Sequence, residues 1–211
     1  MEFENIGGNC ISVISEYIPD YISFALVSRQ FRDSWVNEKK TSRKLLQRYV
    51  KNGNLDMVKF YIKNGCPLRW KKHICILAAD NGHLEILKWA RSEGCQWSKW
   101  ICWLAAGKGH LETLKWAISE GCQLDKWICI YAACNGHLET LKWARSQGCP
   151  WDEQVCSYAA SNGHLETLKW ARSQGCPWDV ETCTNAALGG HMETLKWARQ
   201  TCAYLQQIKK L

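Results

Sequence analysis

Histidine and cysteine recur along this chain at regular intervals, so metal binding and catalysis must be considered first. The chain has thirteen cysteines, and five histidines follow one another every 27 residues: His83, His110, His137, His164 and His191. Tetrahedral zinc requires close ligand pairs such as C-x₂₋₄-C, whereas Cys95, Cys102 and Cys122 are separated by seven and then twenty residues. Catalysis requires a nucleophile, a base and an orienting group at one place, and five equivalent histidines define no such place. We therefore expect no enzyme activity, catalytic residue, metal or cofactor, and we expect the histidines to cap helices through the adjoining loop.

Other residue types keep the same 27-residue step. Residues 136–152 and 163–179 are identical as GHLETLKWARSQGCPWD, and a looser copy occupies residues 53–67. The remaining landmarks of the repeat are Trp89, Trp116, Trp143, Trp170 and Trp197, with Cys75, Cys102, Cys129, Cys156 and Cys183. A fixed period of this length is typical of stacked supersecondary units that bury their apolar faces against their neighbours.

Each unit is predicted to contain two short helices. Cys75, Ala78, Ala79 and Gly82 form a stripe of small residues at helical spacing, and a second helix with its own apolar stripe begins after Gly82. Helices of about ten residues are not stable alone in water, so stacking must stabilise them. We expect the cysteines to be buried as small apolar residues without disulfides, and the tryptophans of the second helix to fill the space between units.

The segment AADNGHLEILKWARSEGC resembles the core of the ankyrin repeat, in which two alanines end the inner helix and Gly-His opens the outer one. The resemblance implies an all-α, ankyrin-type helix-turn-helix solenoid over residues 42–211. Its units would be 42–70, 71–98, 99–125, 126–152, 153–179 and 180–206, followed by a C-terminal cap. Ankyrin units usually have 33 residues and a Thr-Pro-Leu-His segment, and both features are altered here. Such short, Trp-rich and Cys-rich units look like the ankyrin arrays that are abundant in giant DNA viruses and in some protists.

Residues 1–41 form a different predicted module, which is helical. The run ISVISEYIPDYISFALVSRQFRDSW resembles an F-box, the motif that docks on the Skp-type adaptor of cullin-RING ubiquitin ligases, although Ile6-Gly7 lies where the family has Leu-Pro. The resemblance implies adaptor contacts through apolar residues, namely Ile14, Ile18, Leu26, Val27 and Phe31. The alternative is a helical cap that covers the first apolar face of the array.

Positions that differ between otherwise similar units mark the candidate target-binding face, because repeated packing residues cannot provide selectivity. These positions lie at the start and along the first helix of each unit: Leu77, Lys99, Trp100, Leu104, Lys126, Trp127, Tyr131, Glu153 and Tyr158. Tryptophan and tyrosine commonly anchor protein interfaces. We expect an unknown target protein on a concave face, with surface drift after duplication as the alternative.

The charge of the chain, +7, is concentrated near its start, where residues 29–51 carry eight basic and two acidic residues. Such a segment permits a nucleic-acid alternative, although a solvated basic helix face is the simpler interpretation. The acidic start Met1-Glu2-Phe3-Glu4 and the lack of an apolar run of about 18 residues predict an intracellular, cytoplasmic protein that binds no membrane. If the source is viral, this would be the host cytoplasm. We also expect a monomer. The predicted function is a non-enzymatic protein-binding scaffold that recruits substrates to an SCF-type ubiquitin ligase, with a purely architectural scaffold as the alternative.

Overall fold

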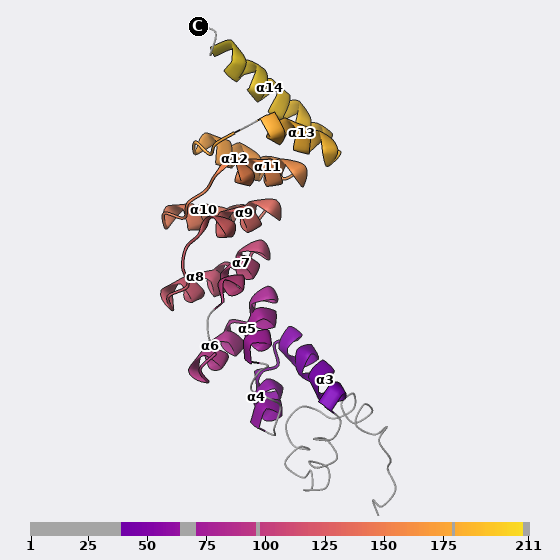
Figure 1. Ribbon diagram of the computed structural model, residues 1–211, viewed down its shortest axis with the longest axis vertical. Helices are drawn as coiled ribbons and strands as arrows, with labels where there is room; N and C mark the ends of the chain where they lie inside the picture. The colour runs from indigo at the N-terminus through magenta and orange to yellow at the C-terminus, as the bar shows by residue number, and fades with distance from the viewer. Residues whose placement is uncertain (1–38, 64–70, 96–97, 179, 209–211) are drawn as a thin grey trace, which may run out of the picture.

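A computed structural model describes residues 39–63, 71–95, 98–178 and 180–208, and all regular structure in these ranges is helical (Figure 1). The predicted all-α class is therefore confirmed for this part of the chain. The proposed adaptor contacts Ile14, Ile18, Leu26, Val27 and Phe31 lie outside it. The helices are α3 (Lys39–Lys51), α4 (Leu55–Lys63), α5 (Lys71–Asp80), α6 (Leu84–Ser92), α7 (Lys99–Gly107), α8 (Leu111–Ser119), α9 (Lys126–Cys134), α10 (Leu138–Ser146), α11 (Glu153–Ser161), α12 (Leu165–Ser173), α13 (Val180–Leu188) and α14 (Met192–Ile208).

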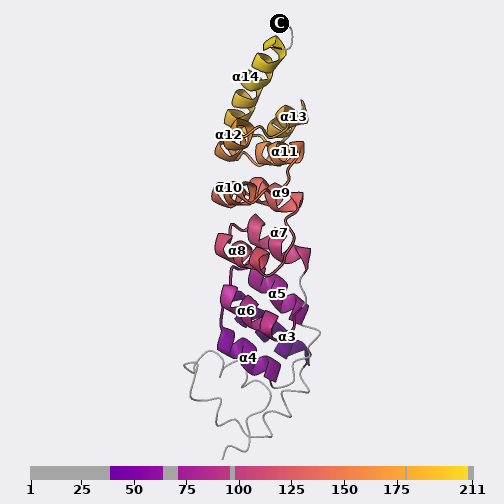
Figure 2. The same ribbon diagram turned by 90° about the vertical axis from the view of Figure 1, so that its left-hand side faces the viewer.

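Successive helices pack as pairs, and the pairs stack in chain order into one column (Figures 1 and 2). The odd-numbered helices lie along one side of the column and the even-numbered helices along the other, and each odd-numbered helix packs against the next one, from α3 to α13. The column bows so that the odd-numbered helices line its hollow side. We call this side, formed by α5, α7, α9, α11 and α13, the concave face.

Both helices of a pair end in the same backbone turn. At the end of α9, Gly136 has a φ of +73°, the Gly136 N–H donates to the carbonyl of Ala133 at 3.2 Å, and the His137 N–H donates to the carbonyl of Ala132 at 2.9 Å. This is a Schellman motif, in which glycine supplies the left-handed residue. At the end of α10, Gly148 has a φ of +79° and occupies the equivalent place. From the pair α5–α6 to the pair α11–α12, glycines of the repeat therefore end both helices.

The core runs along the interior of the column between the two rows of helices. In the central pair it contains Cys129 and Ala132 from α9 and Leu141 and Ala144 from α10, none of which is exposed to solvent. The predicted stripe of small residues is thus confirmed. The even-numbered helices also bury a position that was not predicted from the sequence. In α10 this position is Thr140, which is 2% exposed.

The tryptophans of the even-numbered helices are half-buried against this core rather than enclosed between units. Trp170 makes an edge contact with Trp151, with ring centroids 6.0 Å apart, and the Arg145 guanidinium lies 4.0 Å from the Trp151 ring centroid. Because Arg145 belongs to α10 and Trp170 to α12, Trp151 links two successive pairs. The expectation that these tryptophans fill the space between units is therefore corrected: they lie at the edge of the core, and Trp170 contacts the preceding pair through the loop residue Trp151.

Two disulfides correct the expectation that the cysteines are unpaired. Cys75 is bonded to Cys95, and Cys102 is bonded to Cys122. Each bond connects the odd-numbered helix of a pair to the turn that closes the even-numbered helix, because the pairing of the two helices brings these positions together. The expectation that the cysteines are buried is confirmed for both pairs.

None of the helices in the described ranges is both long enough and apolar enough to span a bilayer.

Candidate binding face

Aromatic side chains gather on the concave face between α7 and α9. The ring centroids of Trp100 and Trp103 are 5.0 Å apart, and Trp103 stacks on Tyr131 at 6.1 Å. Trp127 lies 5.9 Å from Trp103 and 6.1 Å from Tyr131. These four residues, which we call the aromatic cluster, span two successive helix pairs. Aromatic pairs at such distances stabilise each other beyond the area that they bury.

The first turns of α9 and α11 hold this cluster in place. Asp125 caps α9 by accepting a hydrogen bond from the Trp127 N–H at 3.2 Å, and the same carboxylate oxygen accepts from Trp103 Nε1 at 2.8 Å. Asp152 caps α11 and also accepts a hydrogen bond from Lys126 Nζ at 2.8 Å. Asp125 and Asp152 therefore act twice, because each caps its own helix and fixes a side chain of the preceding odd-numbered helix.

Charged side chains lie beside the cluster, and one of them, Lys126, is held by a hydrogen bond. The hydrogen bond to Asp152 raises the pKa of Lys126, and its ammonium group lies 5.8 Å from the Trp127 ring centroid. Lys99 is exposed at the start of α7 and Glu153 at the start of α11. The concave face is therefore basic beside the aromatic cluster and becomes acidic one helix pair further along.

The exposed fractions separate the residues selected from the sequence into two groups. Trp100 is 50% exposed, Trp127 is 37% exposed and Tyr158 is 42% exposed, which is unusual for aromatic side chains of this size. Leu77, Leu104 and Tyr131 are half-buried. The structure brings Trp100, Trp127 and Tyr131 together in the cluster, and it places Tyr158 on α11, one helix pair further along the same face.

Trp103 is not among the residues predicted from the sequence, although it contacts all three other members of the cluster. The rule that selected its neighbours would have found it, because position 103 also differs between units, with Ile76, Ile130 and Ser157 at the equivalent places.

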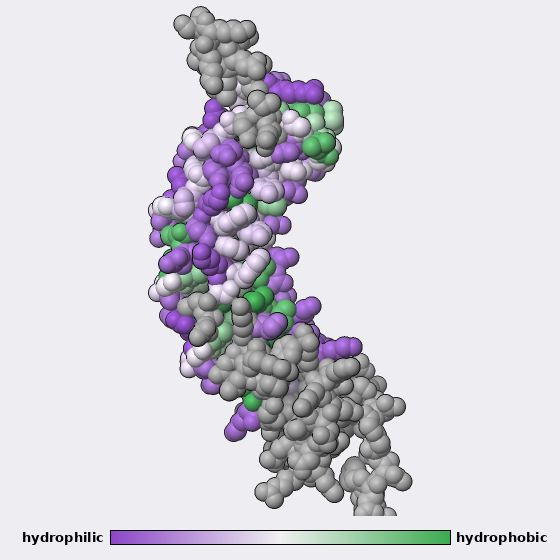
Figure 3. Space-filling model, in the orientation of Figure 1, coloured by the Kyte–Doolittle hydropathy of each residue, from purple (hydrophilic) through white to green (hydrophobic). Residues whose placement is uncertain are grey.

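Apolar side chains on the side of the molecule seen in Figure 3 are scattered over a mainly hydrophilic surface.

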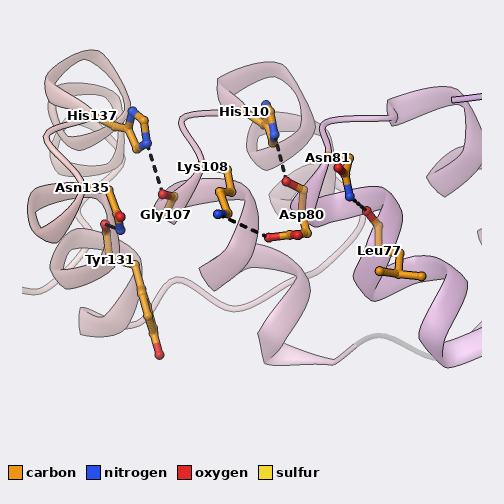
Figure 4. Close-up of polar contacts among 9 residues, drawn as sticks. All are labelled: Leu77, Asp80, Asn81, Gly107, Lys108, His110, Tyr131, Asn135 and His137. Atoms are coloured by element: carbon orange, nitrogen blue, oxygen red, sulfur yellow. Dashed lines mark hydrogen bonds and ion pairs between the residues drawn. The ribbon is translucent and has the colours of Figure 1, made fainter. Parts of the chain in front are cut away.

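The repeated histidines connect successive helix pairs. His110 Nε2 donates to the backbone carbonyl of Asp80 at 3.1 Å, and His137 Nε2 donates to that of Gly107 at 3.1 Å (Figure 4). His83 and His164 make the same contact with Lys51 and Cys134, at 2.7 and 3.1 Å. The capping role is confirmed, but its place is corrected: each ring caps an odd-numbered helix of the preceding pair, not its own adjoining loop.

In the described ranges, no group of three or more His, Cys, Asp or Glu side chains could hold a metal ion. No family model matches the chain, and no curated protein matches it.

Proposed function

We propose that the protein is a non-enzymatic binding scaffold that captures a target protein on its concave face. The observation that carries this proposal is the aromatic cluster: Trp100 and Trp127 are exposed there, although the packing residues around them are buried. Large aromatic side chains held rigidly on a surface bind a partner with little loss of conformational entropy. The invariant residues make contacts within the column, which leaves the variable residues to select the target.

The charges around the cluster specify the kind of target. Lys99 and Lys126 lie beside the exposed indoles, whereas Glu153 lies on the neighbouring helix pair. A segment that places an apolar or aromatic side chain against Trp100 and Trp127, with a carboxylate toward Lys99, would complement this surface.

The experiment compares capture by three forms of the protein. The first is the wild type, the second is Trp100→Ala/Trp127→Ala, and the third is the matched control Glu139→Ala/Glu166→Ala, which removes two exposed carboxylates from the even-numbered helices. The proposal requires partners that bind the wild type and the control but bind the cluster variant at least about tenfold more weakly. If every partner binds all three folded forms equally, the concave face is not the binding site.

We further propose that the column is an ankyrin-type solenoid and that residues 1–41 are an F-box. The stacked helix pairs and the Gly-His turns support the first part, and the sequence resemblance supports the second. The ligase link is tested by pull-down with a Skp-type adaptor. Retention that is lost in Leu26→Asp and Phe31→Asp would support it, and absence of retention at micromolar concentration would reduce the protein to a binding scaffold without a ligase link.

A further inference from the structure

The cysteines of the repeat occur as pairs twenty residues apart, and the structure holds these pairs in two chemical states. The first cysteine lies on an odd-numbered helix, and the second follows the glycine that ends the even-numbered helix of the same pair. There are four such pairs: Cys75 with Cys95, Cys102 with Cys122, Cys129 with Cys149, and Cys156 with Cys176. The first two are disulfides, whereas Cys129, Cys149, Cys156 and Cys176 are thiols.

The backbone places all four pairs alike. The N–H of the second cysteine donates to the carbonyl five residues earlier at 3.0 Å in every case, at Cys95, Cys122, Cys149 and Cys176. Both members of the two thiol pairs are 0% exposed. The thiol pairs are therefore in the same local structure as the disulfides.

Hydrogen bonds show that the sulfur atoms of one thiol pair are neighbours. The Cys129 side chain is hydrogen-bonded to Cys149, and Cys149 Sγ in turn donates to the backbone carbonyl of Asp125 at 3.1 Å. Cys176 Sγ donates to the equivalent carbonyl, that of Asp152, at 3.4 Å. Residues 136–152 and 163–179 are identical in sequence, so the second pair has the same closing turn as the first.

We propose that Cys129–Cys149 and Cys156–Cys176 are redox modification sites that close to disulfides, so that the array carries between two and four covalent links. The co-reactant is a small-molecule disulfide such as oxidised glutathione. The thiolate of Cys149 attacks one of its sulfur atoms, which forms a mixed disulfide and releases one glutathione thiolate. The Cys129 thiolate then attacks the Cys149 sulfur, which forms the protein disulfide and releases the second glutathione. The two protons lost by the protein thiols go to the two released glutathiones, so two protein thiols are oxidised and one glutathione disulfide is reduced.

The surroundings assign the roles of the two sulfurs. The hydrogen bond from Cys129 and the positive charge of Arg145 lower the pKa of Cys149, whereas the bond to Cys149 and burial raise the pKa of Cys129. Cys149 is thus the better first nucleophile. It also lies between Gly148 and Pro150, both of which are exposed, so local opening of this turn would bring its sulfur toward solvent.

The test incubates the folded protein with oxidised glutathione, blocks the remaining thiols and maps the linked tryptic peptides by mass spectrometry. Cleavage after lysine and arginine separates Cys129 (residues 127–142) from Cys149 and Cys156 (residues 146–169) and from Cys176 (residues 173–196). We expect these three peptides to become linked, with the loss of four alkylatable thiols and a rise in the urea midpoint of unfolding. Cys149→Ser should release peptide 127–142 and leave the other two linked.

Cys134 provides the matched control, because it lies on the same tryptic peptide as Cys129 but has no cysteine twenty residues later. Cys134→Ser should leave all links intact, whereas Cys129→Ser should abolish the link of its peptide. Circular dichroism checks that each variant is folded, and an alanine replaces any serine that unfolds the protein. The proposal is overturned if peptide 127–142 stays unlinked while Cys75–Cys95 is oxidised. It is also overturned if the link survives Cys129→Ser, or if it forms only in urea.

Discussion

Gly136 and Gly148 close two helices with the same backbone turn, but only Gly136 lies against a histidine of the next helix pair. A Cβ added to Gly136 would lie 2.5 Å from Nδ1 and 2.8 Å from Cε1 of His164, whereas nothing lies within 4 Å of a Cβ added to Gly148. The two φ values are +73° and +79°. Gly136→Ala and Gly148→Ala therefore impose the same backbone penalty and differ in the contact with the imidazole.

The magnitudes follow from these contacts. An alanine in the left-handed region costs about 1 to 2 kcal/mol, which is the expected loss of unfolding free energy for Gly148→Ala. Gly136→Ala must also displace the His164 ring, which forms a hydrogen bond with the Cys134 carbonyl at 3.1 Å. Loss of that hydrogen bond costs about 1 kcal/mol, and crowding in a packed site costs about 1 to 3 kcal/mol. We expect a total loss of about 3 to 6 kcal/mol for Gly136→Ala, from the sum of these terms.

Urea unfolding monitored by far-ultraviolet circular dichroism measures these losses, and a double-mutant cycle with His164→Ala isolates the contact. With the ring removed, the cost of Gly136→Ala should fall to that of Gly148→Ala, which gives a coupling of about 2 kcal/mol or more. Equal costs for the two alanine variants, or a Gly136→Ala cost that does not change when His164 is removed, would refute the conclusion that the histidine contact joins the helix pairs.

Three further predictions concern single side chains. Desolvation lowers the pKa of His137, partly opposed by its hydrogen bond to the Gly107 carbonyl, and His110, His164 and Lys108 add positive charge nearby. The stability that depends on neutral His137 should therefore be complete above the unfolded pKa of about 6.5 and fall as the pH drops through the lower folded pKa. A change in the urea midpoint between pH 7.5 and pH 5 that is the same in the wild type and in His137→Asn would contradict this. Asp152→Ala should lower the free energy of unfolding, measured by urea titration, by about 1 kcal/mol because the helix cap is lost. This loss should exceed that of Lys126→Met, which removes only the ion pair, and the reverse order would show that the cap is unimportant. Trp151→Ala should cost about 3 kcal/mol or more because it removes a large side chain packed between Arg145 and Trp170, and a loss below about 1 kcal/mol, typical of surface positions, would show that this residue does not link the pairs.

Much of the column could be predicted from the sequence because the interactions that define each helix are local. The glycines at Gly136 and Gly148 end helices through hydrogen bonds within five residues, and Ala132 and Ala133 are alanines at the equivalent positions of all five 27-residue units. A local rule repeated every 27 residues gives helices of constant length, nine residues each from α6 to α13. The variable positions that mark the candidate binding face could be read by comparing the units with one another.

The sequence by itself therefore determined the helix pairs and the small residues of their core, because these depend on neighbours a few residues away. It also determined the variable positions, because the repeat allows the units to be compared with one another. The tertiary structure alone decided which atoms meet across the pairs. It placed the His164 ring within hydrogen-bond distance of the Cys134 carbonyl thirty residues earlier, and it brought Trp103 against Tyr131. These contacts depend on how far each pair is shifted and rotated relative to the next, and packing of whole helix surfaces sets that geometry.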